Sequence, residues 1–181
     1  MTGTGDPGLR VLVIQHHREN RKKCSLTPVL ERPDLEVVVP RAGTTGYPPM
    51  ALPAGILLQV GAPVLTAADR AHLDADPTRR LVLLDGNWVK IPSMLDRLRA
   101  AEALWPRSLP TGLRTAYPRR SKLFEDPEGG LASIEALHAA LTILGERDDS
   151  WLQGYHWAHG FLDLNREFFV TATRCRQESL R

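Results

Sequence analysis

The first half of the chain contains four short runs of almost uninterrupted apolar residues. They occupy positions 10–15 (RVLVIQ), 35–40 (LEVVVP), 56–61 (ILLQVG) and 80–85 (RLVLLD). Strands of a parallel sheet that is covered on both faces have this composition, whereas a sheet with one solvated face alternates apolar and polar residues. The pattern therefore predicts a mostly parallel β-sheet, with residues 107–111 as a candidate for a short fifth strand.

Two helices are expected between and after these strands. Thr66 and Asp69 stand three positions apart, as in a capping box with Asp in place of Glu, and predict a helix from there to about residue 75. Pro92 has the position that proline favours in the first turn of a helix, so it predicts a second one. The stretch 41–53 is rich in turn-forming residues and is expected to be a flexible loop.

After the Gly129-Gly130 pair the pattern becomes helical. Apolar residues recur at helical spacing from 131 to 144, Ser133 is a natural N-cap, Glu135 suits the helix dipole, and Gly145 stands at the expected C-cap. Six aromatic residues after position 149 predict one or two further helices. We therefore expect an α/β fold, with the sheet in residues 1–92 and a mostly helical C-terminal half, 93–181, packed against it.

The composition fits a folded protein of a reducing compartment. Of 181 residues, 43% are hydrophobic and 24% are charged, which excludes disorder as the main state. The length suits one domain or two small ones. Cys24 and Cys175 cannot complete a four-ligand zinc site, and no metal is expected. Without an apolar run of membrane-spanning length or a signal-peptide core, the sequence predicts a cytoplasmic protein with no membrane partner.

Charge is distributed unevenly along the chain. Residues 1–122 contain 18 basic and 11 acidic side chains, a net charge of +7, whereas residues 123–181 contain 5 and 10, a net charge of −5. Arginine, which suits bidentate phosphate contacts, supplies 19 of the 23 basic residues. This favours an anionic partner, although a GC-rich genome would also enrich arginine. Two basic clusters stand out: Arg18, Arg21, Lys22 and Lys23, then Arg114, Arg119, Arg120 and Lys122.

Two motifs match known functional patterns, but the residues around them do not support a functional interpretation. Residues 3–8 match the GxGxxG dinucleotide pattern but precede the first strand, so no helix N-terminus follows to hold a pyrophosphate. His156 and His159 share a helical face but lack a third metal ligand, so structural histidines are the favoured interpretation. The chain also lacks the nucleophile-elbow and phosphate-loop signatures, which excludes the common hydrolase and nucleoside-triphosphatase classes.

Asp85-Gly86-Asn87-Trp88 follows a buried strand directly, at the place where open α/β sheets bind their ligands. A hairpin turn is the structural alternative, because Asp-Gly is a favoured turn pair, but the next residues lead into a helix. A carboxylate beside an exposed indole is able to hold a cation or a purine. Residues 131–136 (LASIEA) start a helix after a glycine pair, either as a simple cap or as the wall of a ligand pocket.

These pieces, in this order, resemble the aminocarboxypropyltransferase superfamily, which contains small-subunit ribosomal RNA enzymes and DTW-domain tRNA-uridine enzymes. The resemblance covers about residues 10–170. The matching segments are residues 22–25 (KKCS), 65–70 (LTAADR), 84–88 (LDGNW), 116–118 (AYP), 131–137 (LASIEAL) and 157–167 (WAHGFLDLNRE).

The resemblance implies a knotted, SPOUT-like fold that binds S-adenosylmethionine and transfers its aminocarboxypropyl group to RNA. In such a reaction N3 of a uridine, or of a modified uridine, attacks the aminocarboxypropyl carbon and methylthioadenosine leaves. Because the sulfonium is a good leaving group, in-line positioning supplies much of the acceleration, and a carboxylate can help to remove the imide proton.

The same resemblance implies the site residues. Asp85 is the catalytic candidate, either as a base or as an anchor for the cofactor. The cofactor is expected to lie between the loop after Asp85 and residues 109–117, closed by the start of the helix near Leu131. Its candidate contacts are Ser25, Leu84, Trp88, Leu109, Pro110, Ala116, Tyr117, Leu131, Ala132 and Ser133. The eight residues of the two basic clusters are the expected RNA contacts.

The residues combine features of both branches of the superfamily. The chain has only Cys24 where DTW-domain proteins have an N-terminal cysteine cluster, and Asn87 where they have threonine. The segment after Trp157 is similar to the ribosomal branch, whereas Arg119-Arg120 and the helix start after them are more similar to the DTW side. Ribosomal RNA is therefore slightly favoured over tRNA. A SPOUT-like RNA methyltransferase and a non-catalytic RNA-binding assembly factor are the alternatives.

Overall fold

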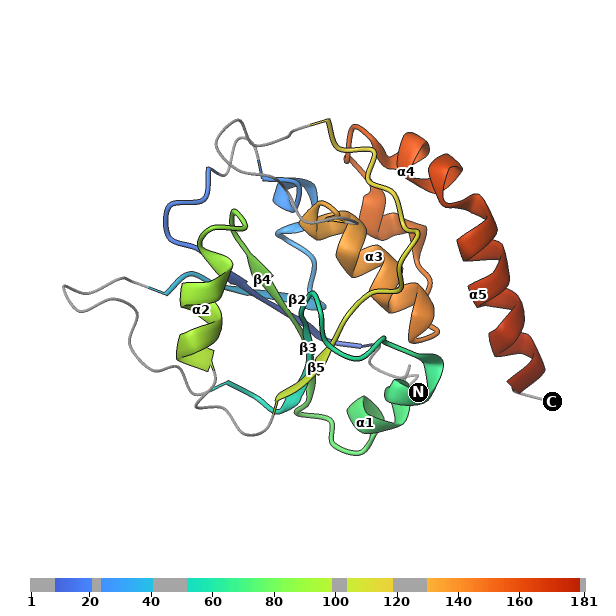
Figure 1. The fold of residues 1–181 in the computed structure, drawn as a ribbon, viewed down its shortest axis with the longest axis horizontal. Coiled ribbons are helices and arrows are strands. Elements are labelled where there is room, and N and C mark those ends of the chain that lie inside the picture. The colour runs from blue at the N-terminus through green and yellow to red at the C-terminus, as the bar shows by residue number, and fades with distance from the viewer. Residues whose placement is uncertain (1–8, 21–23, 41–51, 99–103, 119–129, 180–181) are drawn as a thin grey trace, which may run out of the picture.

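A computed structural model describes residues 9–20, 24–40, 52–98, 104–118 and 130–179. Five parallel strands form one sheet in the order β2-β1-β4-β3-β5, which confirms the predicted parallel sheet (Figure 1). The strands are β1 (Val11–Gln15), β2 (Leu35–Val38), β3 (Gly55–Leu58), β4 (Arg80–Asp85) and β5 (Leu104–Arg107). Their order places β4 at the centre with β1 beside it, so the two segments that follow these parallel strands leave the sheet side by side.

The first and second strands are one and two residues shorter than expected, and the third and fifth differ more. The third strand ends at Leu58 because the chain turns at Gly61, whose φ of +81° suits glycine. The fifth strand lies at 104–107 instead of 107–111, and only Ser108 continues it, through a single bridge to Val64. Pro106 lacks a backbone N–H, which an edge strand such as β5 tolerates.

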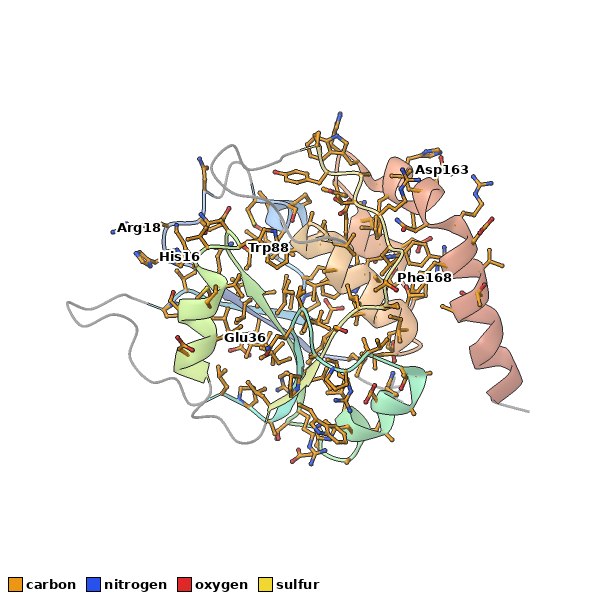
Figure 2. The ribbon with its side chains drawn as sticks, viewed as in Figure 1. His16, Arg18, Glu36, Trp88, Asp163 and Phe168 are labelled. Atoms are coloured by element: carbon orange, nitrogen blue, oxygen red, sulfur yellow. The ribbon has the colours of Figure 1, made fainter. Side chains whose placement is uncertain are left out.

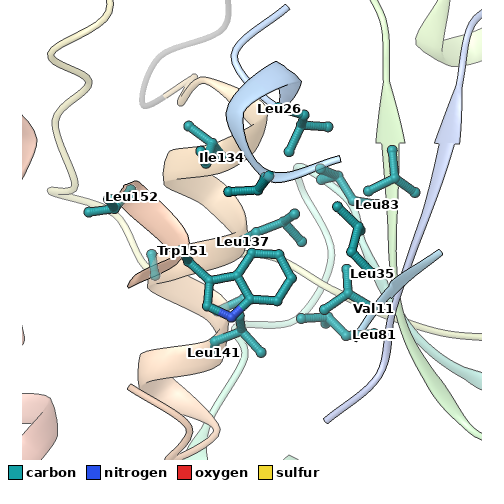
Figure 3. Packing of buried hydrophobic residues seen from close by; sticks show 14 of the residues in the cluster. Val11, Leu26, Leu35, Leu81, Leu83, Ile134, Leu137, Leu141, Trp151 and Leu152 are labelled. Carbon is teal, nitrogen blue, oxygen red and sulfur yellow. The ribbon is translucent and has the colours of Figure 1, made fainter. Parts of the chain in front are cut away.

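Helices cover both faces of the sheet. Helix α2 (Ile91–Leu98) packs on one face, where the even-numbered residues of β1 and β4 meet Met94. Helices α1 (Arg70–Asp74) and α3 (Ser133–Ile143) cover the other face, against the odd-numbered residues. Figure 1 shows the sheet between α2 and α3, and Figure 3 shows Leu81 and Leu83 packed toward Leu137 and Trp151. The side-chain alternation therefore decides which strand residues face α3.

The predicted helix starts were correct in type but not in every cap. Thr66 and Asp69 form the expected capping box, which opens the 3₁₀ turn η3 (Ala67–Asp69) that leads into α1. In α3, however, Ala132 occupies the N-cap and Ser133 is the first helical residue, so the prediction that Ser133 caps this helix is wrong. Ser133 points its hydroxyl elsewhere, to Asp85. Gly145 has φ +85° after the helix, as expected for its C-terminal end.

The C-terminal aromatic stretch forms the predicted helices outside α3. The 3₁₀ turn η4 (Asp149–Leu152) is followed by α4 (Ala158–Leu164) and α5 (Arg166–Ser179), and a further 3₁₀ turn, η2 (Thr27–Val29), packs near η4. Phe161 and Phe169 are buried against His138 of α3, which fixes α4 and α5 to the core. Among the described residues, none of the helices has the length and apolarity needed to cross a membrane.

Candidate active site

Asp85 ends the central strand β4 directly opposite Gln15, the last residue of β1. Asp85 lies at the strand tip, as the sequence predicted, and the residue is 95% buried. One carboxylate oxygen accepts from Gln15 Nε2 at 2.9 Å and from Cys24 Sγ at 3.4 Å, and the other accepts from Ser133 Oγ at 2.5 Å. The carboxylate therefore joins four chain segments: the ends of β1 and β4, the segment at Cys24, and the start of α3.

Cys24 acts in this cluster as a neutral donor. Burial, and then the negative charge of Asp85, raise the pKa of the Cys24 thiol to about 12. The thiol therefore keeps its proton at neutral pH and points it at the carboxylate. This excludes Cys24 as a thiolate nucleophile.

Two serine hydroxyls lie beside the buried carboxylate. Ser25 Oγ accepts a hydrogen bond of 3.4 Å from the backbone N–H of Ile134, in the first turn of α3. Ser133 donates its own hydroxyl hydrogen to Asp85, as described above. The structure thus brings together three of the predicted residues, Ser25, Asp85 and Ser133, although they are up to 108 positions apart in the sequence.

The segment after Asp85 leads into a helix, as expected, and is not a hairpin. Lys90 N–H donates to the carbonyl of Asn87 at 2.9 Å, and α2 begins one residue later. A Cβ on Gly86 would lie 3.2 Å from the Cβ of His16, so this position has little room for a side chain. Trp88 is half-buried, not the exposed indole that we expected.

Leu84 occupies a different environment from its neighbour Asp85. Its side chain packs with Met94 in the core under α2, on the face of the sheet opposite α3. A cofactor beside Ser133 would therefore meet only the backbone of Leu84.

A second buried carboxylate, Glu135, organises the other predicted cofactor segment. It is fully buried in α3 and accepts four hydrogen bonds. One oxygen accepts from Ala116 N–H and from the Tyr155 hydroxyl, both at 3.0 Å, and the other accepts from the Thr115 hydroxyl at 2.6 Å and from Ala132 N–H at 3.0 Å. Burial and the negative charge of Glu135 raise the pKa of Tyr155, which keeps its proton and donates it.

Sequence reasoning assigned Glu135 only to the helix dipole. The sequence did contain a signal for a further role, because Glu135 lies between Ile134 and Leu137 in a mostly apolar helix. A charged residue on a buried helix requires partners. Its partners are 3 to 20 residues away, and the pattern of α3 alone does not identify them.

The remaining cofactor candidates line the segment between β5 and α3. Tyr117 packs edge-on against Trp157 with ring centroids 4.9 Å apart. Leu109 and Leu131 are half-buried at the margin of the main core, and Pro110 is half-buried beside Leu109. Asn165, at the junction of α4 and α5, clamps this segment by accepting from Arg114 N–H and donating to the Arg114 carbonyl, both at 2.8 Å.

The predicted RNA contacts are described only in part. Arg18, after β1, and Arg114, before Ala116, are exposed. In Figure 2, Arg18 projects from the same end of the sheet at which Trp88 lies. The other six basic candidates, Arg21, Lys22, Lys23, Arg119, Arg120 and Lys122, lie outside the described residues, as do the glycine-rich residues 3–8 and most of the loop 41–53.

The histidine pair lies at the start of α4, beside the aromatic residue that contacts Tyr117. Both His156 and His159 are exposed, and the ring of His156 packs against Trp157 with centroids 5.0 Å apart. His159 Nδ1 is 2.9 Å from Asp163, which Figure 2 shows across the molecule from Trp88. Within the described part of the chain, no three His, Cys, Asp or Glu side chains are grouped so that they could hold a metal ion.

His16 is buried beside Gly86 on the α2 face of the sheet. Its Nδ1 accepts from the backbone N–H of Arg18 at 3.1 Å. Burial, together with the positive charges of Lys90, His17 and Arg18, lowers the pKa of His16 from 6.5 to about 4. The imidazole is therefore neutral in the folded protein at physiological pH.

This neutral histidine should make the fold sensitive to acid. Between about pH 6.5 and 4 the unfolded chain binds a proton at His16 that the folded chain does not, so the free energy of unfolding falls as the pH is lowered through this range. Asparagine at position 16 can still accept from Arg18 but does not titrate. Urea unfolding at pH 7 and pH 4.5 should show a smaller loss for His16→Asn than for the wild type. Equal losses would show that His16 is not responsible.

Taken together, these features define a parallel α/β protein with a candidate ligand site at the carboxyl edge of its sheet, where such folds bind their ligands. The family model described as "Ribosome biogenesis protein, C-terminal" matches residues 56–179. A 16S rRNA aminocarboxypropyltransferase from Halobacterium salinarum is 30% identical over 129 residues, which cover 70% of this chain and 69% of the relative.

Two further proteins support the same grouping. A 16S rRNA aminocarboxypropyltransferase from Methanosarcina mazei is 33% identical over 94 residues, and the chain spans about half the length of this relative. The solved structure of the SAM-dependent rRNA:acp-transferase Tsr3 from Vulcanisaeta distributa has a TM-score of 0.66 and 25% identity, and the match covers 92% of this chain and 83% of that one. This chain therefore belongs to the aminocarboxypropyltransferase family of ribosome biogenesis proteins, as its motifs predicted.

Proposed function

We propose that this protein transfers the 3-amino-3-carboxypropyl group of S-adenosylmethionine to a uridine, or a modified uridine, of small-subunit ribosomal RNA. The observation that carries the proposal is the cluster of Asp85, Ser25 and Ser133 at the carboxyl edge of the sheet. These residues come from the motifs on which the family resemblance rests. The relatives are named for 16S rRNA, which favours ribosomal RNA over tRNA.

The residues at this edge fit S-adenosylmethionine chemically. Leu109, Leu131 and Tyr117 offer half-buried apolar surface of the kind that an adenine ring fills, with backbone groups beside it. The amino acid end of the ligand carries an ammonium and a carboxylate. Because Ser133 gives its hydrogen to Asp85, its oxygen remains an acceptor for the ammonium; because Ser25 accepts from Ile134, its hydrogen remains available to the carboxylate.

In this arrangement Asp85 serves as an anchor more than as a base. Both of its oxygens already accept hydrogen bonds from protein groups, and the side chain is 5% exposed. It fixes the hydroxyl of Ser133 and, through it, the first turn of α3. The chain thereby holds the aminocarboxypropyl arm in line with the incoming base, and orientation of this kind accounts for large rate accelerations.

When bound, S-adenosylmethionine supplies a sulfonium leaving group: the bond from N3 to the aminocarboxypropyl carbon forms as the carbon–sulfur bond breaks, and methylthioadenosine leaves. The N3 proton is released to solvent. Exposed Arg18 and Arg114, with the neighbouring basic residues of both clusters, would hold the RNA backbone, whereas the target base is selected by shape and stacking. The proposal includes the knotted, SPOUT-like topology of the resemblance, which the likeness to the Vulcanisaeta structure supports.

The test is a product assay with a small-subunit rRNA fragment and S-adenosylmethionine labelled in either the aminocarboxypropyl arm or the methyl group. We expect label from the arm, and not from the methyl group, in the RNA, with methylthioadenosine as coproduct. Label from the methyl group with adenosylhomocysteine would instead establish a methyltransferase. RNA binding with neither product would establish an assembly factor, and label in tRNA alone would move the substrate to the other branch.

A further inference from the structure

We infer that Glu135 is a positioning residue that locks the two walls of the cofactor site together. The inference rests on the proposed function, because it assigns the residue to the site that would bind S-adenosylmethionine. Glu135 is not among the residues predicted to touch the cofactor. It acts through their backbones.

The Glu135 carboxylate joins two segments of the chain. Ala116 belongs to the segment between β5 and α3, and Ala132 belongs to the residues immediately before α3. Both were predicted to contact the cofactor, and the two stand 16 positions apart. Glu135 accepts the backbone N–H of each at 3.0 Å, so one side chain sets the distance between them.

The four donors are divided between the two oxygens of Glu135 in a way that only a carboxylate can accept. Each oxygen of Glu135 receives one backbone N–H and one hydroxyl: Ala116 with Tyr155 on one, and Ala132 with Thr115 on the other. A hydroxyl can rotate and become an acceptor, but a backbone N–H can only donate. A glutamine at this position therefore places its NH₂ group against one of the two N–H groups, whichever way the amide is turned.

Burial makes this conflict costly to relieve. Glu135 is 0% exposed, so water cannot replace a lost acceptor. Ile134, the neighbour of Glu135 in α3, is also buried and holds the helix in place. The segment at Thr115 and Ala116 is less constrained, since Thr115 is exposed. We therefore expect a glutamine at 135 to release this segment and not the helix.

The donors also supply matched controls. Tyr155, which lies between η4 and α4, belongs to neither wall, so Tyr155→Phe removes a donor to the same carboxylate and leaves both backbone contacts in place. Thr115→Val removes a donor that belongs to the wall between β5 and α3, and Thr115→Ser restores the hydroxyl. If the role of Glu135 is purely structural, ligand affinity should follow thermal stability across these variants. If Glu135 is a positioning residue, affinity should fall only in the variants that cut a contact between the carboxylate and one of the two walls.

The experiment measures S-adenosylmethionine affinity by calorimetry at a temperature at which every variant is folded. We expect Glu135→Gln to weaken binding about tenfold or more, Thr115→Val to weaken it by a smaller factor that Thr115→Ser recovers, and Tyr155→Phe to leave it within about threefold while lowering the melting temperature. Unchanged affinity in Glu135→Gln, or an equal loss in Tyr155→Phe, would overturn the inference.

Hydrogen exchange of the ligand-free protein separates this inference from the proposed function. In Glu135→Gln the amides of residues 113–117 should exchange faster, while those in the middle of α3 keep their wild-type rates. If the wild type fails to bind S-adenosylmethionine, the proposed function is wrong and the cofactor part of the inference falls with it. If binding is normal but exchange at 113–117 is unchanged in the variant, the coupling through Glu135 is refuted while the proposed function stands.

Discussion

Asp85→Asn is expected to lower both the stability of the fold and the rate of aminocarboxypropyl transfer. An amide at position 85 has one accepting oxygen in place of two, while Gln15, Cys24 and Ser133 all donate to the present carboxylate. Losing charged acceptors for buried donors costs about 1–3 kcal/mol, which urea unfolding would detect. If the NH₂ group faces Ser133, the serine must reverse its hydroxyl, and its oxygen is no longer free for the ligand. The resulting misplacement should slow transfer by about two powers of ten.

The outcome distinguishes three roles for this carboxylate. A loss of two to four powers of ten in rate with unchanged stability would identify Asp85 as the base, in the usual range for such a group. A large drop in melting temperature with normal turnover would make it a turn-former only. The expected combination of both losses defines an anchor. Phe169→Leu is the control. Phe169 belongs to α5 and is buried in the core, far along the chain from the site, so this variant should lower stability while turnover is unchanged.

The sheet and the position of Asp85 could be predicted because the signals are local. An uninterrupted apolar run such as 80–85 shows a buried parallel strand by itself, and the residue that ends the strand necessarily lies at the carboxyl edge. The helix that follows Asp85 could be predicted in the same way, since proline favours the first turn of a helix and Pro92 has that position. These inferences need no knowledge of what packs on the strand.

The partners of the two buried carboxylates could not be predicted in this way. Asp85 meets Gln15 and Ser133 at separations of 70 and 48 residues, and such contacts depend on the strand order and on the path of α3. Ser133 illustrates the difficulty. Its sequence position suits an N-cap, but Ala132 takes that place. The Ser133 hydroxyl instead donates to the buried carboxylate of Asp85, a charged acceptor that only the tertiary structure brings near.

The two carboxylates together explain why the start of α3 can serve as one wall of a site. Asp85 holds Ser133 to the sheet, and Glu135 holds Ala132 to the segment at Ala116. The helix start is thus tied on one side to the strand edge and on the other to the segment after β5. Rigid support from both sides is the arrangement that precise placement of a reacting carbon requires.

Gly55→Ala is expected to destabilise the fold strongly, because a Cβ at this position would lie very close to a backbone oxygen of the neighbouring strand. Gly55 is the first residue of β3 and pairs with Arg80 of β4. A Cβ built there would lie 1.9 Å from the Arg80 carbonyl oxygen and within 3 Å of two other backbone atoms of Arg80, and φ at Gly55 is +157°. Backbone atoms cannot rotate away as a side chain can, so β3 must separate from β4 at its start. We expect a loss of about 3 kcal/mol or more, a large part of the total stability of an ordinary domain.

Gly61→Ala provides the comparison, because Gly61 has φ +81° but nothing within 4 Å of its Cβ position. Its cost should reflect backbone conformation alone, about 1–2 kcal/mol. Chemical denaturation of both variants at neutral pH measures the difference that the contact with Arg80 makes. The slope of the free energy with denaturant should stay the same if the variant still folds as one unit. Equal stabilities for the two variants would show that β3 and β4 can accommodate the methyl group, and that the close approach at Gly55 is not what requires glycine there.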